Sequence, residues 1–205
     1  MPTKGERTKA QIVAAAAPIF NERGFAGTSL SDILAATGLE KGGIYRHFES
    51  KDDLAVAAFD YAVRVLEARQ RRSLENAQTA LERLYACVDV FASSLTHPAL
   101  RGGCPMLNTA IDADDTHPAL RERARQAVAH WQKLIFDIAE EAKANGELDA
   151  ATESKILASV ITSSLEGAIM VSRLLRDQLH MDRVVSHLRA WLATCETPTS
   201  TLVPR

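Results

Sequence analysis

The stretch from Thr28 to Phe48 constrains this chain more than any other, because it reads as two short helices joined by a tight turn. Gly38 interrupts a run of residues at helical spacing, and a second short run follows it. The apolar residues that mark the two runs are Leu30, Ile33, Leu34, Ile44 and Phe48. This arrangement predicts a helix-turn-helix motif, and the rest of the chain is expected to support it.

The second short helix has an inward and an outward side. At about 100° per residue, Ile44 and Phe48 point into the domain, whereas Gly42 points away from it. The outward side also offers hydrogen-bond donors from Lys41, Tyr45, Arg46 and His47. A short face that is rich in donors is suited to contact another molecule.

Gly42 and Gly43 stand where helix propensity argues against them, since each glycine costs about 1 kcal/mol relative to alanine. One interpretation is that they clear side chains from the start of the helix, so that its free N–H groups approach a phosphate or a base edge. The other is that a first helical turn tolerates glycine cheaply. The donors around them favour the first interpretation, which is DNA binding.

Further fixed spacings surround the motif over about fifty residues, a quarter of the chain. They are Ala15 to Phe20, Arg23-Gly24-Phe25, Thr28-Ser29, Asp32-Ile33, Thr37-Gly38-Leu39, Lys41-Gly42, Tyr45, His47-Phe48 and Ser50-Lys51 followed by Leu54. With this pattern the chain resembles the tetracycline-repressor-like (TetR/AcrR) transcription regulators. The resemblance implies an all-helical homodimer whose N-terminal domain reads a palindromic operator and whose larger C-terminal domain binds a small effector.

The resemblance also implies roles for individual residues. Thr28 and Ser29 would meet phosphates from the second helix, and Lys51 would hold a phosphate from the start of the fourth. The recognition helix would present Lys41, Gly42, Gly43, Tyr45 and His47 to double-stranded DNA, and Arg46 is expected to join them because it is a donor on the outward side. Two positions depart from the family pattern: Glu40 replaces a small hydroxyl cap, and Gly43 replaces a frequent Thr or Ser. Glu40 either accepts a hydrogen bond from a cytosine amino group or complements the helix N-terminal dipole.

Composition is consistent with a soluble, folded regulator. Of the 205 residues 46% are apolar, which excludes disorder as the main state. No apolar run approaches the length of about 20 residues that a membrane span needs, and the first residues are polar. We therefore expect a soluble, cytoplasmic protein. The three cysteines are widely separated and indicate neither a disulfide framework nor a zinc site.

Charge is distributed unevenly along the chain, although the net charge is only −2. Residues 1–51 contain seven Lys and Arg against five Asp and Glu, whereas the remainder contains 17 against 21. A modestly basic head on an acidic body suits a protein that binds one DNA site. Residues 1–5 read as a flexible arm. Lys4 in this arm, with Arg7 and Lys9 just after it, either reaches the DNA backbone or forms solvated surface.

The spacing of apolar residues predicts helices throughout. The first contains Pro18, which should bend it, and Gly24 should stop it. A Ser50 cap with acidic residues in the first turn opens the fourth helix, which would link the two functional parts. The expected helices beyond the DNA-binding motif are 51–74, 79–97 ended by Pro98, 104–113, from about 118 to 145, 152–178 and 182–194.

The acidic run from Asp112 to His117 superficially offers metal ligands. Thr116, Pro118 and Glu122 instead fit a helix cap, an early-turn proline and an acidic first turn. We therefore predict capping and no metal site. We also expect no cofactor.

The two C-terminal helices indicate a subunit interface. The helix at 152–178 carries apolar residues on more than one side, together with small residues that allow a close partner. With the helix at 182–194 it would form half of a four-helix interface completed by a second subunit. The alternative is a monomer that buries both faces internally.

Cys104 opens the short apolar helix after Gly102-Gly103. This segment resembles a subset of the family with a Gly-Cys pair there, in which it lines the effector cavity and the cysteine of some members reacts with electrophiles or oxidants. Its position near a helix N-terminus would stabilise a thiolate, whereas the other interpretation is a small buried hydrophobe.

These observations predict a dimeric, ligand-responsive repressor that a small, largely apolar effector releases from its operator. The expected domains are a DNA-binding domain at residues 1–51, an effector-binding and dimerisation domain at 52–195, and a polar tail at 196–205 whose end resembles a cleaved-tag remnant. The expected effector-binding residues are Cys104, Met106, Leu107, Ile111, Trp131, Glu166 and Met170. The alternatives are a thiol sensor acting through Cys104, an enzyme using the same cavity, and a helical interaction module. No nucleotide loop, zinc spacing or nucleophile elbow supports an enzyme.

Overall fold

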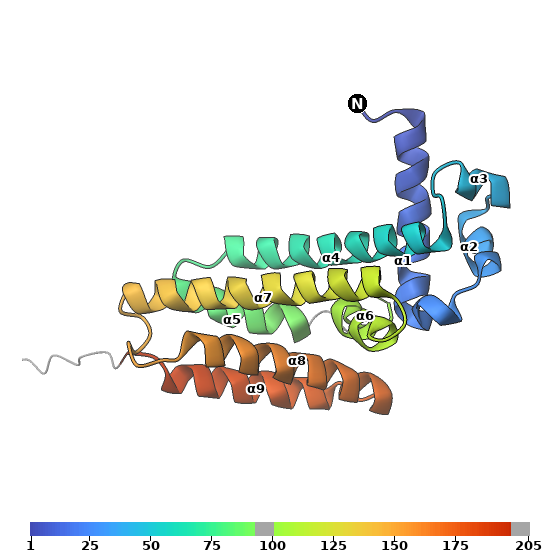
Figure 1. Ribbon diagram of the computed structural model, residues 1–205. Coiled ribbons are helices and arrows are strands. Elements are labelled where there is room, and N and C mark those ends of the chain that lie inside the picture. Colours follow the sequence, from blue (N-terminus) through green and yellow to red (C-terminus); the bar gives the residue numbers. More distant parts are fainter. Residues whose placement is uncertain (93–100, 198–205) are drawn as a thin grey trace, which may run out of the picture. The chain divides into compact units, whose positions relative to one another are not determined.

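The computed structural model describes residues 1–92 and 101–197, and its regular structure within them is entirely α-helical (Figure 1). The all-α fold predicted from the sequence is confirmed. The predicted helix end at His97 and Pro98, and the tag-like end of the tail, lie outside the described residues. The helices are α1 (Lys4–Gly27), α2 (Leu30–Thr37), α3 (Lys41–Tyr45), α4 (Lys51–Glu75), α5 (Ala80–Ala92), α6 (Pro105–Ala113), α7 (Pro118–Ala144), α8 (Ser154–Leu175) and α9 (Leu179–Thr194).

Two helix starts differ from the sequence-based prediction. The expectation of a flexible arm over residues 1–5 is wrong, because α1 begins at Lys4, where Thr3 and Glu6 cap each other reciprocally. Helix α7 is capped by His117 rather than by Thr116. The imidazole Nδ1 of His117 accepts a hydrogen bond of 3.2 Å from the amide of Leu120, while the Thr116 hydroxyl donates back to the Asp112 carbonyl.

The chain forms two compact units that are interleaved in sequence. The first contains residues 1–69 and the described part of 93–130; the second contains residues 70–92 and the described part of 131–205. Helices α4 and α7 therefore contribute residues to both units. The DNA-binding motif belongs to the first unit, together with α6. The predicted functional boundary near residue 51 remains a prediction.

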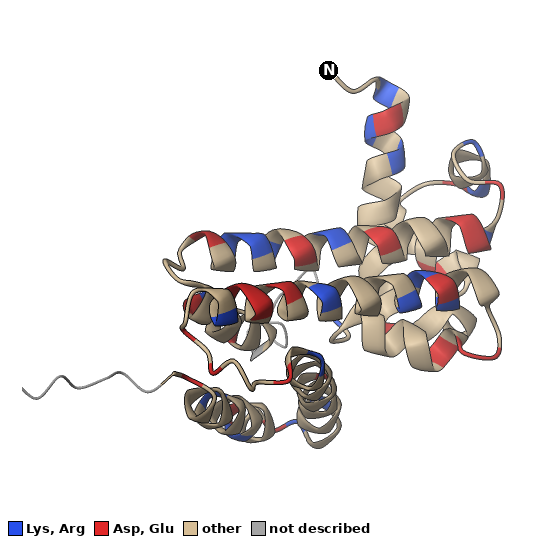
Figure 2. Cartoon of the chain, turned by 60° about the vertical axis from the view of Figure 1, so that its left-hand side comes forward, with Lys and Arg blue, Asp and Glu red and all other residues tan. Residues whose placement is uncertain are grey.

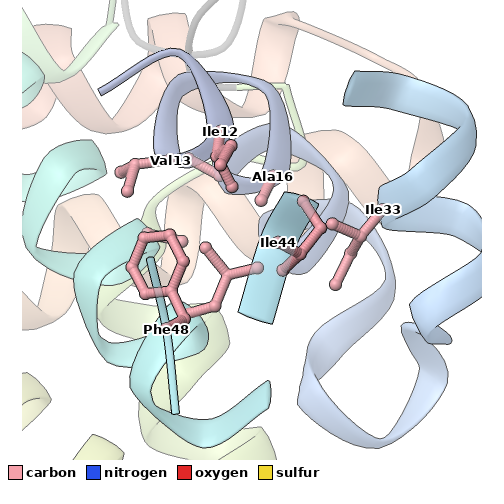
Figure 3. Packing of buried hydrophobic residues seen from close by; sticks show 9 residues of the cluster. Ile12, Val13, Ala16, Ile33, Ile44 and Phe48 are labelled. Atoms are coloured by element: carbon pink, nitrogen blue, oxygen red, sulfur yellow. The ribbon is translucent and has the colours of Figure 1, made fainter. Parts of the chain in front are cut away.

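One aliphatic cluster holds α1, α2 and α3 together in the first unit (Figure 3). Ile12 and Ala16 of α1 pack with Ile33 of α2 and with Ile44 and Phe48, and each of these five side chains is at most 5% exposed. Burial of a large apolar side chain stabilises the fold by about 1.5–3 kcal/mol. Because α2 and α3 are short, this cluster fixes their positions.

Helix α1 continues through Pro18 and breaks six residues later. Within its bounds the one residue without helical backbone angles is Gly24, with φ of 74°. This position leaves no room for a side chain, since a Cβ on Gly24 would lie 2.6 Å from a carboxylate oxygen of Asp112. The role predicted for Gly24 as a helix stop is thus explained by both its φ and its surroundings.

A polar clasp joins the end of α1 to α6. The Asn21 side-chain amide donates to the carbonyls of Arg101 and Gly103, at 2.8 and 2.9 Å. The Asn108 amide donates to the carbonyls of Asn21 and Gly102, at 3.0 and 2.7 Å. One turn further along α6, a carboxylate oxygen of Asp112 accepts a 2.6 Å hydrogen bond from the amide of Phe25. We call Asn21, Asn108 and Asp112, with these backbone partners, the α1–α6 clasp.

The second unit is built around α8, whose two sides differ. Its buried side includes Leu157, Ile161, Leu165 and Ile169, each at most 1% exposed. Helix α8 packs against α9 and α5. It is long and apolar enough to cross a membrane, the one such helix among the described residues, but half of its apolar stretch is buried in this unit. It is therefore a core helix.

The end of α9 is tied to α5 by polar contacts in the second unit. The Tyr85 hydroxyl donates a 2.6 Å hydrogen bond to Glu196, and Arg189 pairs with Asp89 at 2.7 Å. Burial, followed by the bond to the Glu196 carboxylate, raises the pKa of Tyr85 to about 12. The phenol therefore stays a hydrogen-bond donor throughout the neutral pH range.

The clasp yields a stability prediction for Gly102→Ala. Gly102 has φ of 99°, and a Cβ there would lie 2.5 Å from the carbonyl oxygen of Asn21. Backbone strain and this collision together should cost about 3 kcal/mol or more, because the backbone of α1 cannot move away cheaply. Gly146→Ala is the matched control, since its φ is also positive, at 74°, but nothing lies within 4 Å of the added Cβ. It should cost only about 1–2 kcal/mol.

Chemical denaturation of both variants measures the difference in the free energy of unfolding. Equal losses for Gly102→Ala and Gly146→Ala would contradict the close approach of α1 to the start of α6.

Candidate nucleic-acid interface

Local hydrogen bonds at each end of α2 determine where this helix begins and where the chain turns into α3. The Ser29 hydroxyl accepts from the amide of Asp32, and the Asp32 carboxylate accepts from the amide of Ser29, which forms a capping box. Gly38 ends α2 with φ of 66°, and its amide donates to the Leu34 carbonyl at 2.9 Å. A left-handed residue at this point is cheap only for glycine, so Gly38 determines the turn into α3.

The Asp32 carboxylate also anchors α2 to α1. Arg23 lies 2.5 Å from one of its oxygens, while Ser29 donates to the other from its hydroxyl and its backbone. The hydrogen bonds from the Ser29 hydroxyl and amide, followed by the bond from Arg23, lower the pKa of Asp32 to about 2. Because the pKa of Asp32 in the folded state lies below its ordinary value of 3.8, this stabilising contribution is present above about pH 4. It is lost as the pH falls toward 2.

The outward face of α3 is placed as the sequence predicted. Ile44 and Phe48 are 2% and 5% exposed, whereas Tyr45 is 41% exposed. The other exposed residues on α3 and immediately next to it are Glu40, Lys41, Gly42 and Arg46, while His47 is half-buried. The Lys41 ammonium lies 5.8 Å from the centroid of the Tyr45 ring. The face thus presents one ammonium, one guanidinium and one phenol to solvent, from Lys41, Arg46 and Tyr45, around the exposed Gly42.

Gly42 is not required by the fold. A Cβ on Gly42 would meet nothing within 4 Å, and its backbone does not adopt a positive φ. Gly43 is more restricted, because a Cβ there would lie 3.4 Å from the Cβ of Leu39. Since neither packing nor backbone conformation explains Gly42, the bare surface at this position is available for the close approach of another molecule.

Three residues predicted to contact phosphates also make bonds within the chain. Thr28 is fully buried, and its hydroxyl donates to the Gly24 carbonyl at 2.7 Å. The Lys51 ammonium donates to the Phe25 carbonyl at 2.6 Å and lies 4.2 Å from the centroid of the Phe25 ring. The Ser29 hydroxyl is part of the capping box. These side chains support the end of α1, and their phosphate contacts remain predictions.

The residues predicted to bind an effector occur in both compact units. Cys104, Met106, Leu107 and Ile111 belong to the first, and Trp131, Glu166 and Met170 belong to the second. Cys104, Met106 and Trp131 are nearly inaccessible, at 2%, 2% and 4% exposed. Ile111 and Met170 are instead 68% and 49% exposed in the single chain. Their assignment to one effector site remains a prediction.

Sequence reasoning missed the α1–α6 clasp and the cavity beside it. This cavity lies within the first unit and is lined mainly by apolar residues of α1 and α4, with Asn108, Thr109 and Asp112 from α6. The available signal was weak: Asn108 and Asp112 are polar residues one helical turn apart in a helix that, apart from Thr109, is otherwise apolar. No group of three or more His, Cys, Asp or Glu side chains within the described residues is arranged to hold a metal ion.

Comparison with known families identifies both parts of the chain. Residues 12–58 match the family described as bacterial regulatory proteins of the tetR family. Residues 80–188, more than half of the chain, match the tetracyclin repressor-like C-terminal domain. The chain belongs to the TetR family.

Related proteins support this assignment for the TetR regulator along nearly its whole length. A solved TetR transcriptional regulator from Chloroflexus aurantiacus is 44% identical, with a TM-score of 0.90 over 94% of this chain and 98% of that one. A TetR-family regulator from Cytophaga hutchinsonii is 34% identical, with the same TM-score over 97% and 100%. An HTH-type transcriptional regulator from Mycobacterium tuberculosis is 33% identical over 87% of this chain and 91% of the relative.

Family membership establishes the general activity. The protein is a DNA-binding transcriptional regulator that uses a helix-turn-helix, and its family is not one of enzymes. The enzyme alternative raised by the sequence is therefore set aside. The C-terminal domain is of the kind that typically binds a ligand and dimerises.

The environment of Gly42 yields a prediction for DNA binding by the TetR regulator. Gly42→Ala should leave the free energy of unfolding unchanged or raise it by up to about 1 kcal/mol, because alanine favours the helix and nothing collides. The added methyl group should weaken binding to the operator by about ten-fold, since it prevents close approach of the backbone.

Gly27→Ala is a suitable control, because Gly27 is exposed near the end of α1 and its added Cβ would make only an ordinary 3.7 Å contact. Fluorescence anisotropy with a labelled operator and a thermal melt measure the two properties separately. An affinity equal to that of the unsubstituted protein would count against contact between Gly42 and DNA.

Proposed function

We propose that this TetR regulator is a homodimeric repressor that binds a palindromic operator and is released from it by a small, largely apolar effector. The observation that carries the DNA-binding part is the exposed face of α3, in which donors surround a glycine that the fold does not require. The tetracyclin repressor-like C-terminal domain supports repression as the direction of regulation. We further propose that the protein acts in the cytoplasm, where its DNA target is found.

Contacts to DNA are assigned to two groups of residues. Bases of the major groove would be met by residues of the recognition helix and its C-terminal end, which are Lys41, Gly42, Gly43, Tyr45, Arg46 and His47. Phosphates would be met from Thr28, Ser29 and Lys51. Because the hydroxyl of Thr28 and the ammonium of Lys51 are already engaged, their phosphate contacts would require backbone groups or an exchange of partners.

A second copy of the chain is proposed to cover the outer side of α8. This side carries an apolar stripe that lies opposite the buried side of the same helix, and four of its side chains are between 39% and 79% exposed. We define the α8 stripe as Ile156, Val160, Ser163, Gly167, Met170 and Leu174. Their spacing of three and four residues places them on one face, without any charged group. A continuous apolar face of this kind marks a protein interface.

Twofold pairing through α8 and α9 would determine how the protein reads DNA. Two recognition helices related by a twofold axis fit successive major grooves when they are about 34–36 Å apart. The operator should then be an inverted repeat. An effector weakens binding only if it has a higher affinity for a state in which this separation differs.

The interior of the second unit supports a preference for an effector with a hydrogen-bond acceptor. Trp131 is 4% exposed, and its ring centroid lies 4.6 Å from that of Phe91. Among the described residues, no acceptor meets the Trp131 Nε1 group, although this atom is buried. A buried N–H without a partner is costly, and a bound ligand with an acceptor at this position would satisfy it.

The α1–α6 clasp provides a route by which effector binding could reach the DNA-binding motif. Asn108 and Asp112 connect α6 directly to the last turn of α1, which precedes α2. A shift of α6 would therefore either carry the end of α1 with it or break several short hydrogen bonds. This route adds to the one predicted from the sequence, which was the long helix α4.

Reversible binding is favoured over the thiol-sensor alternative. Cys104 was predicted to be the first residue of the helix and instead lies immediately before α6, and it is only 2% exposed. A sensing thiol must be accessible to its oxidant or electrophile, so this burial favours the interpretation of Cys104 as a packed side chain. Cys87 is also buried, and burial raises the pKa of its thiol to about 12.

Selection of bound fragments from a random pool of DNA duplexes tests the proposed function. The expected result is an inverted repeat whose half-sites are centred about one helical turn apart, because each protomer presents one recognition helix. Binding to it should weaken as salt is added. Recovery of no common sequence would overturn the operator assignment, and recovery of single half-sites would overturn the dimeric mode of binding.

The α8 stripe predicts that Val160→Asp with Leu174→Asp gives a folded monomer. Both side chains are exposed in the single chain, so charges there should leave the protomer intact while opposing burial against a second copy. Sedimentation velocity at micromolar concentration should show a dimer for the unsubstituted protein and a monomer for the double variant.

Leu175→Asp serves as the control for the dimer experiment. Leu175 is 57% exposed but lies about 100° around the helix from Leu174, away from the stripe. The Leu175→Asp variant should therefore remain dimeric. A double variant that still sediments as a dimer would exclude the α8 stripe as the interface.

A further inference from the structure

The first two turns of α1 form a helical projection that contributes no buried side chain to the hydrophobic core. Helix α1 begins at Lys4, whereas its first buried residue is Ile12. The eight residues from Lys4 to Gln11 extend about 12 Å, and all of them except the half-buried Thr8 are exposed. Figure 1 shows these turns projecting beyond α3, on the side away from α4. We call residues 4–11 the α1 projection.

The projection is preformed. The Thr3 amide donates to Glu6 Oε2 at 2.7 Å, and the Glu6 amide donates to the Thr3 hydroxyl at 3.2 Å. These bonds from Thr3 lower the pKa of Glu6, so its carboxylate remains ionised and keeps the cap in place at neutral pH. Two exposed turns without packing would otherwise fray, because isolated short helices are marginal in water.

The projection carries an excess of positive charge. Lys4, Arg7 and Lys9 stand against the single carboxylate of Glu6, which the cap already engages, and Figure 2 shows these charges along the first turns. None of the three cations forms an ion pair with a described residue. A preformed helix with unpaired cations is complementary to a polyanion.

Its cations do not share one direction. Lys9 precedes Ile12 and Val13 by three and four residues, so it lies on the side of α1 that packs against α2 and α3. Its ammonium lies 5.1 Å from the centroid of the Phe48 ring, close to the end of the recognition helix. Arg7 precedes the buried Ala16 by nine residues, or two and a half turns, and therefore points to the opposite side.

We propose that the α1 projection is a second DNA-contacting element, in which Lys9 holds a backbone phosphate next to the base pairs that α3 reads. Lys9 lies beside Phe48, three residues beyond the end of α3, so its ammonium is close to the recognition helix, and its charge matches a phosphate. The contact is independent of sequence, because phosphates carry no base information. This inference rests on the proposed operator binding and adds an element to it.

The test compares Lys9→Gln with Arg7→Gln, which removes the same charge from the same helix on its other side. Affinities for a selected operator and for an unrelated duplex are measured over a range of salt concentrations. Lys9→Gln should weaken binding to both duplexes by the same factor, about ten- to thirty-fold at 0.15 M salt for a dimer. The slope of log K against log salt should fall by about 1.8, since each lost phosphate contact removes about 0.9.

Further variants and measurements distinguish a directed contact of Lys9 from general attraction to DNA. Lys9→Arg retains the charge and should bind within about three-fold of the unsubstituted protein, whereas Arg7→Gln should leave the salt slope unchanged. In an ethylation interference experiment, Lys9→Gln should lose sensitivity at one phosphate in each half-site. Thermal melts of all variants confirm that loss of the contact with Phe48 has not unfolded the domain.

The possible outcomes separate this inference from the proposed function. An unchanged salt slope for Lys9→Gln, with operator binding intact, overturns the inference and leaves the proposed function standing. Equal losses for Arg7→Gln and Lys9→Gln also overturn it, because they indicate undirected attraction rather than one contact. Failure of the unsubstituted protein to bind any duplex overturns both.

Discussion

The DNA-binding surface depends on the insertion of Ile44 and Phe48 between α1 and α2. Helix α3 has only five residues, far too few to be stable by itself. It has no side-chain cap at its start, because Glu40 makes no capping bond. Its position and rotation therefore come from these two buried side chains, and the direction of every donor on its outward face follows from them. A recognition helix this short is essentially a loop held in place by its apolar side.

Residue spacing was sufficient to predict features that depend on periodicity. The inward direction of Ile44 and the outward direction of Tyr45 follow from 100° per residue, and both are confirmed by their exposure. The two sides of α8 were visible for the same reason, because its apolar residues are too many for one stripe. Helix starts were less predictable: His117 and Thr116 are both able to cap α7, and only the structure shows which does.

Features that depend on distant partners were not accessible from spacing. Asn21 and Asn108 lie 87 positions apart, and neither residue alone indicates that its amide closes a contact between α1 and α6. Lys51 is a similar case. Its sequence position fits a phosphate contact, but the carbonyl and ring of Phe25 are within reach and engage its ammonium. A sequence pattern shows which groups are available, whereas the fold decides which neighbour each one meets.

The clasp gives the DNA-binding motif an unusual dependence on a helix outside it. Helix α6 belongs to the same compact unit as α1, α2 and α3, although it begins 60 positions after the end of α3. At Gly102 the backbone of α1 comes too close for a side chain, and at Gly24 the Asp112 carboxylate of α6 does. The position of the motif is therefore determined by its own small core and also by the contacts between α1 and the segment that begins at Cys104.

Under the proposed pairing, the exposed α8 stripe links the amount of protein to its stability. Leu174 is 79% exposed and Ile156 is 56% exposed in the lone chain, so a newly made protomer would carry unprotected apolar surface until it meets a second copy. Stability that comes from association grows with concentration, because mass action favours the paired state. At very low expression the unpaired chains would be the ones most readily lost to proteolysis or aggregation. Below the concentration needed for pairing, few chains would then survive, and above it most would be paired. Under the proposed pairing, regulation would therefore begin over a narrow range of protein concentration.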